Sequence, residues 1–313
     1  MNFRNIHIYS DYSTRSLDLK LVAKKVASFF PNCSFEVRTP FLRYAAQSAD
    51  SQGFDLDETA QSIARTRISD MKAPFDNQRL REHCPQLDTI MYEKNIIDSG
   101  CIKLTDRLRA ENNTLKKPCR ENRLHSEQPS SSSPQPDFFI LYDGFMLQRV
   151  LANSIPKNET SVENVHILFD SRLTCTFSED DWRYHARAVI CGTPSIISVP
   201  GIIEAPAKPK EFYIKQIQYG LQYGVNSLDE KLKQEFAKRF IDYNDIRIND
   251  AAIGYVLQAL FFFLAEGSPF CNYEYCRLFN AHWQESLIHS QIKSQKLCKK
   301  HLKLLKQFIK TKN

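Results

Sequence analysis

Glycine is scarce in this sequence, with nine residues among 313. No glycine-rich phosphate-binding loop, no dinucleotide-binding fingerprint and no G-x-S-x-G nucleophile motif occurs in the chain. These absences argue against P-loop nucleotide hydrolysis, a Rossmann-type dehydrogenase and an α/β-hydrolase. The serine run at 130–133 is flanked by prolines, and we interpret it as a linker without a nucleophilic role.

The chain also has no apolar run long enough to span a bilayer. The longest, at residues 253–265, falls short of the roughly 20 residues that a membrane helix needs, so we expect a buried core helix there. The N-terminal stretch MNFRNIHIYSDYS has no basic region followed by an apolar run, so we expect no signal peptide and a cytoplasmic location, without membrane contact. Cytoplasmic thiols stay reduced, so clustered cysteines would indicate a metal rather than disulfides.

Acidic residues are missing from the end of the chain, where none follows Glu285. Eight lysines lie in that segment, so the modest net charge of +6 is concentrated there. An apolar stripe predicts a helix that buries one face and exposes a basic one. The stripe consists of Leu297, Leu304, Leu305 and Phe308. A basic face next to a zinc knuckle could bind nucleic-acid phosphates, but we prefer a merely solvated face, because Phe308 is the only aromatic residue there for base stacking.

The first part of the chain suggests alternating strands and helices. Residues 5–11 and 33–38 are typical of strands, and residues 16–30 between them have helical spacing. This strand–helix–strand opening indicates an α/β sheet with covered faces. We expect further strands at 137–144, 165–173 and 184–199, and helices at 55–68, 145–155, 211–223, 228–241, 248–265 and 281–310. The prediction is a single α/β domain, with a mixed sheet packed by helices and a helical C-terminal part.

Composition changes sharply at residues 111–136, which are polar and rich in serine and proline. Such a segment cannot bury enough apolar area to order itself, so we expect a disordered insertion. It would separate residues 1–110, the N-terminal part of the α/β domain, from residues 137–265, which continue the sheet and the central helices. Residues 266–313 would form a zinc knuckle and the basic helix. A boundary between independent domains is a less favoured alternative, because the part before the insertion is small for a separate core.

Three of the nine cysteines lie close together near the end of the chain. Cys271 and Cys276 form a C-x4-C pair, and Cys298 and His301 form a C-x2-H pair after a gap of 21 residues. Three thiolates and one imidazole are a usual ligand set for structural zinc, and the gap is near that of known zinc sites. The alternative is a group of buried, inert cysteines and a surface histidine. We favour structural zinc, because polar and charged residues around C-x4-C are unusual in a core.

The C-terminal third resembles the archaemetzincins, a family of zinc-dependent metallopeptidases. Those proteins carry H-E-x-x-H-x-x-G-x-x-H on and after a helix, then a C-x4-C pair and later a C-x2-C pair. With Cys271 on the first cysteine of that pattern, Gly267 falls on the glycine and Cys276 on the second cysteine. Cys298 matches the third cysteine, and His301 replaces the fourth.

Nearly the whole chain, except the insertion, is similar to an archaeal family of uncharacterised metallopeptidase-like proteins. The segments that carry this similarity are YDGFMLQR, WRYHARAVICGTPSIIS, IEAPAKPKEFY and CRLFNAHWQE. The resemblance implies a metzincin-like sheet packed by helices, with a zinc knuckle behind it.

The sequence departs from the family pattern at the catalytic positions. The same alignment places Leu260, Leu264 and Phe270 at the three histidine positions, and Phe261 at the position of the glutamate. A catalytic zinc needs its ligands, an open position for water and usually a carboxylate base. We therefore expect a degenerate or noncanonical metallopeptidase-like protein, which keeps a structural zinc and lacks the standard catalytic one.

Other residues could form a non-standard site. His282 and Glu285 have the spacing of neighbours on one helix face, and such a pair can bind a metal or transfer protons. His185 and Glu204 could join them, and Asp143 ends a buried strand, where α/β sheets often carry functional groups. Simpler roles are more typical: a packed or capping histidine, a solvated glutamate and a histidine at a sheet edge. A third interpretation is a scaffold that binds a peptide or protein partner at a sheet edge.

Overall fold

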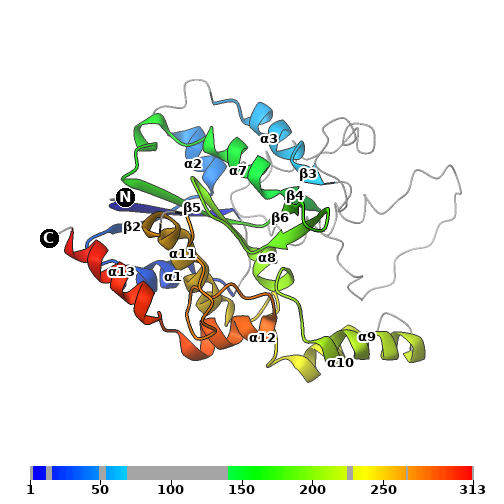
Figure 1. The fold of residues 1–313 in the computed structure, drawn as a ribbon. Helices are drawn as coiled ribbons and strands as arrows, with labels where there is room; N and C mark the ends of the chain where they lie inside the picture. Colours follow the sequence, from blue (N-terminus) through cyan, green and yellow to red (C-terminus); the bar gives the residue numbers. More distant parts are fainter. Residues whose placement is uncertain are drawn as a thin grey trace, which may run out of the picture.

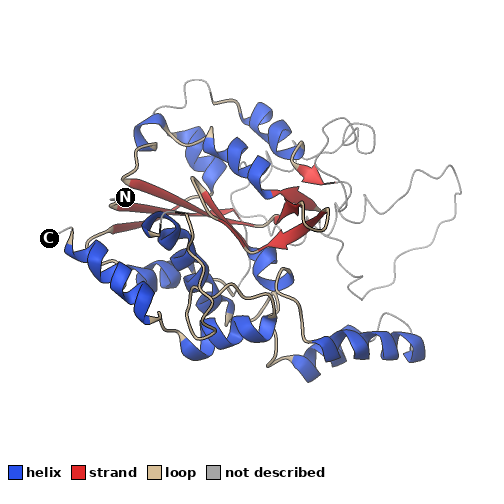
Figure 2. Cartoon of the chain, in the orientation of Figure 1, coloured by secondary structure: helices blue, strands red, loops and turns tan. Residues whose placement is uncertain are grey.

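The computed structural model describes residues 3–11, 16–48, 54–68, 140–223, 228–265 and 267–311. Within them the chain forms a mixed α/β fold with two sheets, and helices cover both faces of the larger sheet (Figures 1 and 2). The predicted insertion at 111–136, with its boundaries, lies outside the described residues. In the described ranges, every helix is too short or too polar to cross a bilayer.

The larger sheet has five strands in the order β2-β1-β5-β9-β8. They are β1 (Asn5–Asp11), β2 (Ser34–Arg38), β5 (Asn164–Asp170), β8 (Val189–Ile190) and β9 (Ser195–Ser198). All neighbours are parallel except β8, which pairs antiparallel with β9 at the edge. The helix α1 (Leu19–Ala27) connects β1 to β2, so the predicted strand–helix–strand opening is confirmed. Asp18 caps α1 by accepting the Leu21 N–H.

The sequence suggested a single mixed sheet, whereas the structure has a second one. Its four strands, in the order β3-β4-β6-β7, are β3 (Arg67–Ile68), β4 (Leu141–Asp143), β6 (Leu173–Ser178) and β7 (Arg183–Arg187). The chain turns into it directly after β5, where Asp170 Oδ1 accepts the Arg172 backbone N–H at 2.9 Å. It returns to the larger sheet between β7 and β8. Apolar periodicity predicts strands but carries no signal for which sheet each one joins.

Successive residues of the larger sheet face two different cores, as the pleat of a strand requires. Ile6 and Ile8 point into the larger core, and Tyr9 points into the smaller one. The larger core contains residues of α1, α8 (Val199–Glu204), α11 (Ile248–Leu264) and α13 (Lys299–Lys310). The smaller one contains residues of α2 (Phe41–Gln47), α3 (Leu56–Ala64) and α7 (Gly144–Ala152). In Figure 1 these two groups of helices lie below and above the sheet.

A third apolar cluster stands apart from both cores. The helices α9 (Lys210–Tyr223) and α10 (Leu228–Phe236) project from the body of the molecule at the lower right of Figure 1. Phe212, Leu232, Phe236 and Phe240 pack together there. Both helices begin where the sequence predicts them, at about residues 211 and 228.

The helix α11 confirms the buried helix expected at 248–265, whereas the long last helix expected at 281–310 is wrong. That segment divides into α12 (Gln284–Leu287), the π-helical η2 (Ile288–Ser294) and α13. Gln295 between them has a left-handed backbone conformation, with φ of 54°, and Lys296 pairs with Cys276. The helix therefore breaks where the chain must bring Cys298 to the other cysteines.

The amphipathic character predicted for the last helix is confirmed. Leu297, Leu305 and Phe308 are buried, and Leu304 is half-buried. The exposed residues of α13 include Lys299, Lys300, Lys303, Lys306 and Lys310. Nucleic-acid binding by this basic face stays the less favoured alternative.

A buried polar network joins β1, β2 and β5 beside the smaller core. Arg38 donates to both carboxylate oxygens of Glu159, at 2.7 and 2.9 Å, and also to the Tyr9 hydroxyl. The Tyr9 hydroxyl lies 2.9 Å from His166 Nδ1, and His166 Nε2 lies 3.1 Å from the Glu159 carbonyl oxygen. A neutral imidazole satisfies both contacts, because Nδ1 accepts from Tyr9 while Nε2 donates to the carbonyl.

The network predicts that acid destabilises the fold through His166. Burial, together with the nearby charge of His7, lowers the pKa of His166 from 6.5 to about 4. The unfolded chain therefore binds this proton more readily, so stability is complete above pH 6.5 and falls as the pH drops toward 4. A difference of that size corresponds to about 3 kcal/mol.

Chemical denaturation between pH 7 and pH 4 would measure this loss. We expect His166→Gln to flatten the pH dependence and His185→Gln, at a half-exposed histidine, to leave it as in the unsubstituted protein. An unchanged pH slope in His166→Gln would show that other groups control the acid response.

Candidate metal centre and the cleft beside it

Four side chains converge behind α11. Cys271 and Cys276 come from the turn after α11, Cys298 directly precedes α13, and His301 lies in the first turn of α13. The Sγ atoms of Cys271 and Cys298 are 3.9 Å apart, and His301 Nδ1 lies 3.5 Å from Cys276 Sγ and 3.1 Å from Cys298 Sγ. All four ligand atoms lie within 4.8 Å of one another.

This spacing fits a tetrahedral metal ion. Sulfur and nitrogen ligands of zinc, at about 2.3 and 2.0 Å from the ion, are roughly 3.5–3.8 Å from each other. Three sulfurs and one imidazole nitrogen favour zinc over hard cations, which prefer oxygen ligands. The predicted ligand set thus forms one compact cluster that could hold a metal ion, with zinc as the best chemical match.

Backbone hydrogen bonds position the cluster. Gly267 ends α11: its N–H donates to the Phe262 carbonyl at 2.9 Å, and its φ of 96° lies in the region that favours glycine. The Cys271 N–H then donates to the Leu278 carbonyl at 2.8 Å, which closes the turn. Across from it, the bridge between Cys276 and Lys296 brings the start of α13 alongside.

Backbone N–H groups also point at the sulfurs. The Tyr273 N–H lies 3.4 Å from Cys271 Sγ, and the Cys298 N–H lies 3.4 Å from Cys276 Sγ. Such donors stabilise the negative charge of a thiolate and orient it toward a metal. The first contact lies within the C-x4-C turn, and the second joins that turn to the start of the last helix.

The proton equilibria of the cluster are consistent with metal binding. Burial raises the pKa of the Cys276 thiol to about 12, so a metal ion must displace that proton. Burial also acts to raise the pKa of Cys298, but backbone N–H groups of His301 and Lys300 and the neighbouring thiols bring it below its usual value. Burial, then the charge of Lys300, lowers the pKa of His301, so its imidazole is neutral, as a ligand must be.

The cluster packs directly on the larger core. The Phe261 ring meets the His301 ring edge-on, with centroids 5.6 Å apart. Leu260 and Phe261 have no exposed surface, and Leu264 is partly buried against the same core. These positions, which the resemblance assigns to a catalytic centre, therefore form part of the core.

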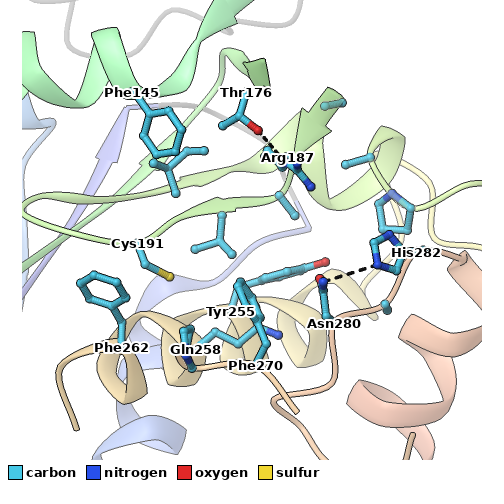
Figure 3. Close-up of a pocket in the computed structure, with 18 of the residues that line it drawn as sticks. Phe145, Thr176, Arg187, Cys191, Tyr255, Gln258, Phe262, Phe270, Asn280 and His282 are labelled. Atoms are coloured by element: carbon cyan, nitrogen blue, oxygen red, sulfur yellow. Dashed lines mark hydrogen bonds between the residues drawn. The ribbon is translucent and has the colours of Figure 1, made fainter. Parts of the chain in front are cut away.

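A cleft of about 400 Å³ lies beside α11. Residues 186–191, from the end of β7 through β8, form the wall above it in Figure 3. Tyr255, Gln258 and Phe262 of α11 form the floor, and the loop at 267–282 closes the side. The volume falls within the range of small-ligand sites, about 300–1,000 Å³.

The metal cluster and the cleft share one loop. Phe270 lines the cleft and directly precedes Cys271, while the Asn280 N–H donates to the Cys271 carbonyl at 3.4 Å. Residues on both sides of the C-x4-C pair thus form one wall. A metal that holds Cys271 and Cys276 would hold that wall in place as well.

The structure does not bring the four catalytic candidates together. His185 Nε2 lies 2.9 Å from an Asp181 carboxylate oxygen, and the Glu204 carboxylate lies 3.7 Å from the Lys208 amine. Within the described residues, the cysteine–histidine cluster is the one group of three or more potential ligands that could hold an ion. Catalytic roles for these residues stay predictions.

The helical pair expected from His282 and Glu285 is wrong. The helix α12 begins at Gln284, so His282 lies before it, in a bend outside the helix. Glu285 instead accepts a hydrogen bond from Arg239 Nε at 2.6 Å. His282 does line the cleft, where its Nε2 lies 3.4 Å from Asn280 Nδ2 (Figure 3).

Asp143 has a structural role at the end of β4. Its Oδ1 accepts the N–H groups of Phe145 and Met146, both at 3.0 Å, and so caps α7. Its Oδ2 accepts the Tyr184 hydroxyl at 3.1 Å. Both oxygens are thus engaged within the fold.

Two residues that line the cleft were not predicted from the sequence. Arg187 follows His185 on β7, and Gln258 lies within the apolar segment that predicted α11. A lone amide in an apolar helix was the available signal for Gln258, since a buried polar group needs a partner. Nothing in the sequence pattern distinguishes Arg187 from a surface arginine.

Comparison with known proteins supports the family resemblance at a general level. Residues 2–108 and 104–308 match the model of the family described as "Probable metallopeptidase family (DUF6775)". Neither the curated proteins nor the solved structures provide a match. Because the family model spans most of the sequence, the chain belongs to this family.

Proposed function

We propose that the chain is a non-standard metallopeptidase-like protein, metzincin-like in fold and related to the archaemetzincins, in which zinc holds the structure and the cleft binds peptides. The observation that carries this proposal is the composition of α11 and the loop behind it. Leu260 and Phe261 face the core, and Phe270 lines the cleft. Of the positions where a standard peptidase centre would need a histidine or a glutamate, Leu260 and Phe261 are therefore core residues, and Phe270 gives the cleft apolar surface.

A structural role for the zinc follows from its ligand count. Four protein ligands complete a tetrahedral shell, whereas a catalytic zinc keeps one position open for water. Cys276 and His301 have about 1% of their surface exposed, and Cys271 has 6%, so substrate has little access to the ion. Zinc at this centre would fasten α13 to the loop that forms the wall of the cleft.

Peptide binding is supported by the edge of the larger sheet. Among the described strands, β8 is the last in the larger sheet, and it lines the cleft, so an extended peptide added at this edge would pair with it. Phe145 and Phe270 border the same space and are 59% and 41% exposed. Exposed aromatic rings beside an open strand edge suit the alternating side chains of an extended peptide.

Binding and hydrolysis can be measured with one probe, fluorescein-labelled oxidised insulin B chain. We expect saturable binding by fluorescence anisotropy, and no cleavage by mass spectrometry after prolonged incubation. Phe270→Asp should weaken binding by about tenfold or more, because the peptide would bury an unpaired carboxylate. Tyr273→Asp is the matched control, since Tyr273 is 65% exposed on the same loop and does not line the cleft. Zinc-dependent cleavage, or binding insensitive to Phe270→Asp, would refute the proposal.

A further inference from the structure

The cleft contains a cation without a counter-ion in the described part of the chain. Arg187 lines it, and its Nε donates to the Thr176 hydroxyl at 2.7 Å. Among the described residues no carboxylate lies within 4.0 Å of this guanidinium. In Figure 3 the side chain enters the space from the β7 side, across from Tyr255 and Asn280. Its two terminal nitrogens can therefore serve a ligand.

The floor of the same cleft has an unused acceptor, across the space from the cation (Figure 3). Gln258 is 2% exposed, and its Nε2 donates to the Phe279 carbonyl at 3.2 Å. Its Oε1 is buried and has no hydrogen-bond partner. A buried carbonyl left unpaired destabilises the protein, so an N–H group brought by a ligand would find a partner there.

One further polar group borders this space. Tyr255 is 6% exposed, and within the described residues its hydroxyl has no hydrogen-bond partner. Burial raises the pKa of Tyr255, so the hydroxyl keeps its proton and is a donor at neutral pH. Arg187 and Tyr255 thus offer donors for an anionic oxygen, and Gln258 Oε1 offers an acceptor for an N–H.

We propose that the cleft binds the C-terminal residue of a peptide. The free carboxylate pairs with Arg187, the last peptide N–H donates to Gln258 Oε1, and an apolar terminal side chain packs among Phe262 and Phe270. This inference rests on the peptide binding proposed above and adds a specificity: the peptide end is recognised, and internal segments bind more weakly. Arg187 is the residue that sets this specificity.

Charge balance favours a carboxylate over a phosphate. Among the described residues, Arg187 is the only lysine or arginine that lines the cleft, and its planar guanidinium matches the two oxygens of one carboxylate. A phosphate dianion would leave excess negative charge beside Phe262, Phe270 and Val189. The apolar lining also suits a side chain attached to the anionic group, which inorganic phosphate lacks.

Calorimetric titration of the full chain with N-acetyl-alanyl-alanyl-alanyl-leucine tests the inference on unaltered protein. The free acid should bind roughly tenfold to a hundredfold more tightly than the same peptide as its C-terminal amide. N-methylation of the last peptide bond should weaken binding by about threefold to tenfold, because Gln258 loses its donor. Inorganic phosphate should not displace the free acid.

A matched pair of variants assigns the effect to one residue. Arg187→Met should abolish the preference for the free acid, whereas Arg183→Met, at an exposed arginine on the same strand, should retain it. Equal binding of acid and amide would overturn the carboxylate inference and leave peptide binding intact. If neither peptide binds, both the carboxylate inference and the proposed peptide binding are overturned. If phosphate displaces the free acid, only the carboxylate inference is overturned. The acid–amide comparison stays decisive if Arg187→Met fails to fold.

Discussion

Replacing Cys271 with serine is expected to release the bound metal and to lower the melting temperature by roughly 10–20 °C. Structural zinc contributes on the order of 10 kcal/mol to small metal-bound folds, and the loss of one of four ligands removes a large part of that. The effect should extend beyond the turn, because Cys271 belongs to the larger core and its carbonyl holds Asn280. Differential scanning calorimetry with and without added zinc measures the change.

Cys33→Ser is the matched control for this experiment. Cys33 is a half-buried thiol that packs against the same core and lies outside the metal cluster. We expect it to retain the metal and to lose little stability. If Cys271→Ser loses its metal and melts at the temperature of the unsubstituted protein, the metal does not hold the structure together.

Replacing Glu159 with glutamine should destabilise the fold by about 2–4 kcal/mol. The side chains of Arg38 and Glu159 are only 9% and 15% exposed, and they share two hydrogen bonds. Glutamine keeps the shape and removes the charge, so Arg38 is left largely buried with the half-exposed Glu36 as its remaining carboxylate partner. Tyr44 also loses a charged acceptor, because its hydroxyl donates to Glu159 at 2.8 Å. Urea denaturation at pH 7 gives the free energy of unfolding.

The control is the same substitution four residues along the chain. Glu163 lies 3.9 Å from Arg4, and both side chains are more than half exposed, so Glu163→Gln should change stability by less than about 0.5 kcal/mol. Equal effects of the two substitutions would show that burial adds nothing to the Arg38–Glu159 pair.

Much of the local structure was predictable because it depends on short-range patterns. The strand at 5–11, the buried helix α11 and the amphipathic last helix follow from apolar periodicity, and each lies within a few residues of its expected place. The metal cluster was predictable because residue type and spacing together restrict it. Cys271, Cys276, Cys298 and His301 lie as close as a shared ion requires.

What the sequence could not reveal depends on long-range geometry. The division into two sheets depends on where the chain turns after Asp170. Apolar periodicity does not indicate which sheet the next strand joins. The break at Gln295 is imposed by the pairing of Lys296 with Cys276, which overrides local helix preference. Likewise, the cleft joins Arg187 to Gln258 from elements that are far apart in the sequence.

The zinc content of the purified chain tests the central claim most directly. Inductively coupled plasma mass spectrometry, calibrated by quantitative amino-acid analysis, should find about one zinc per chain, since four protein ligands define a single closed site. The thiolate ligands predict that this zinc resists dialysis against a weak chelator and is missing from Cys271→Ser. A protein that is folded without zinc would contradict the structural role, and two zinc ions per chain would reveal a second metal centre.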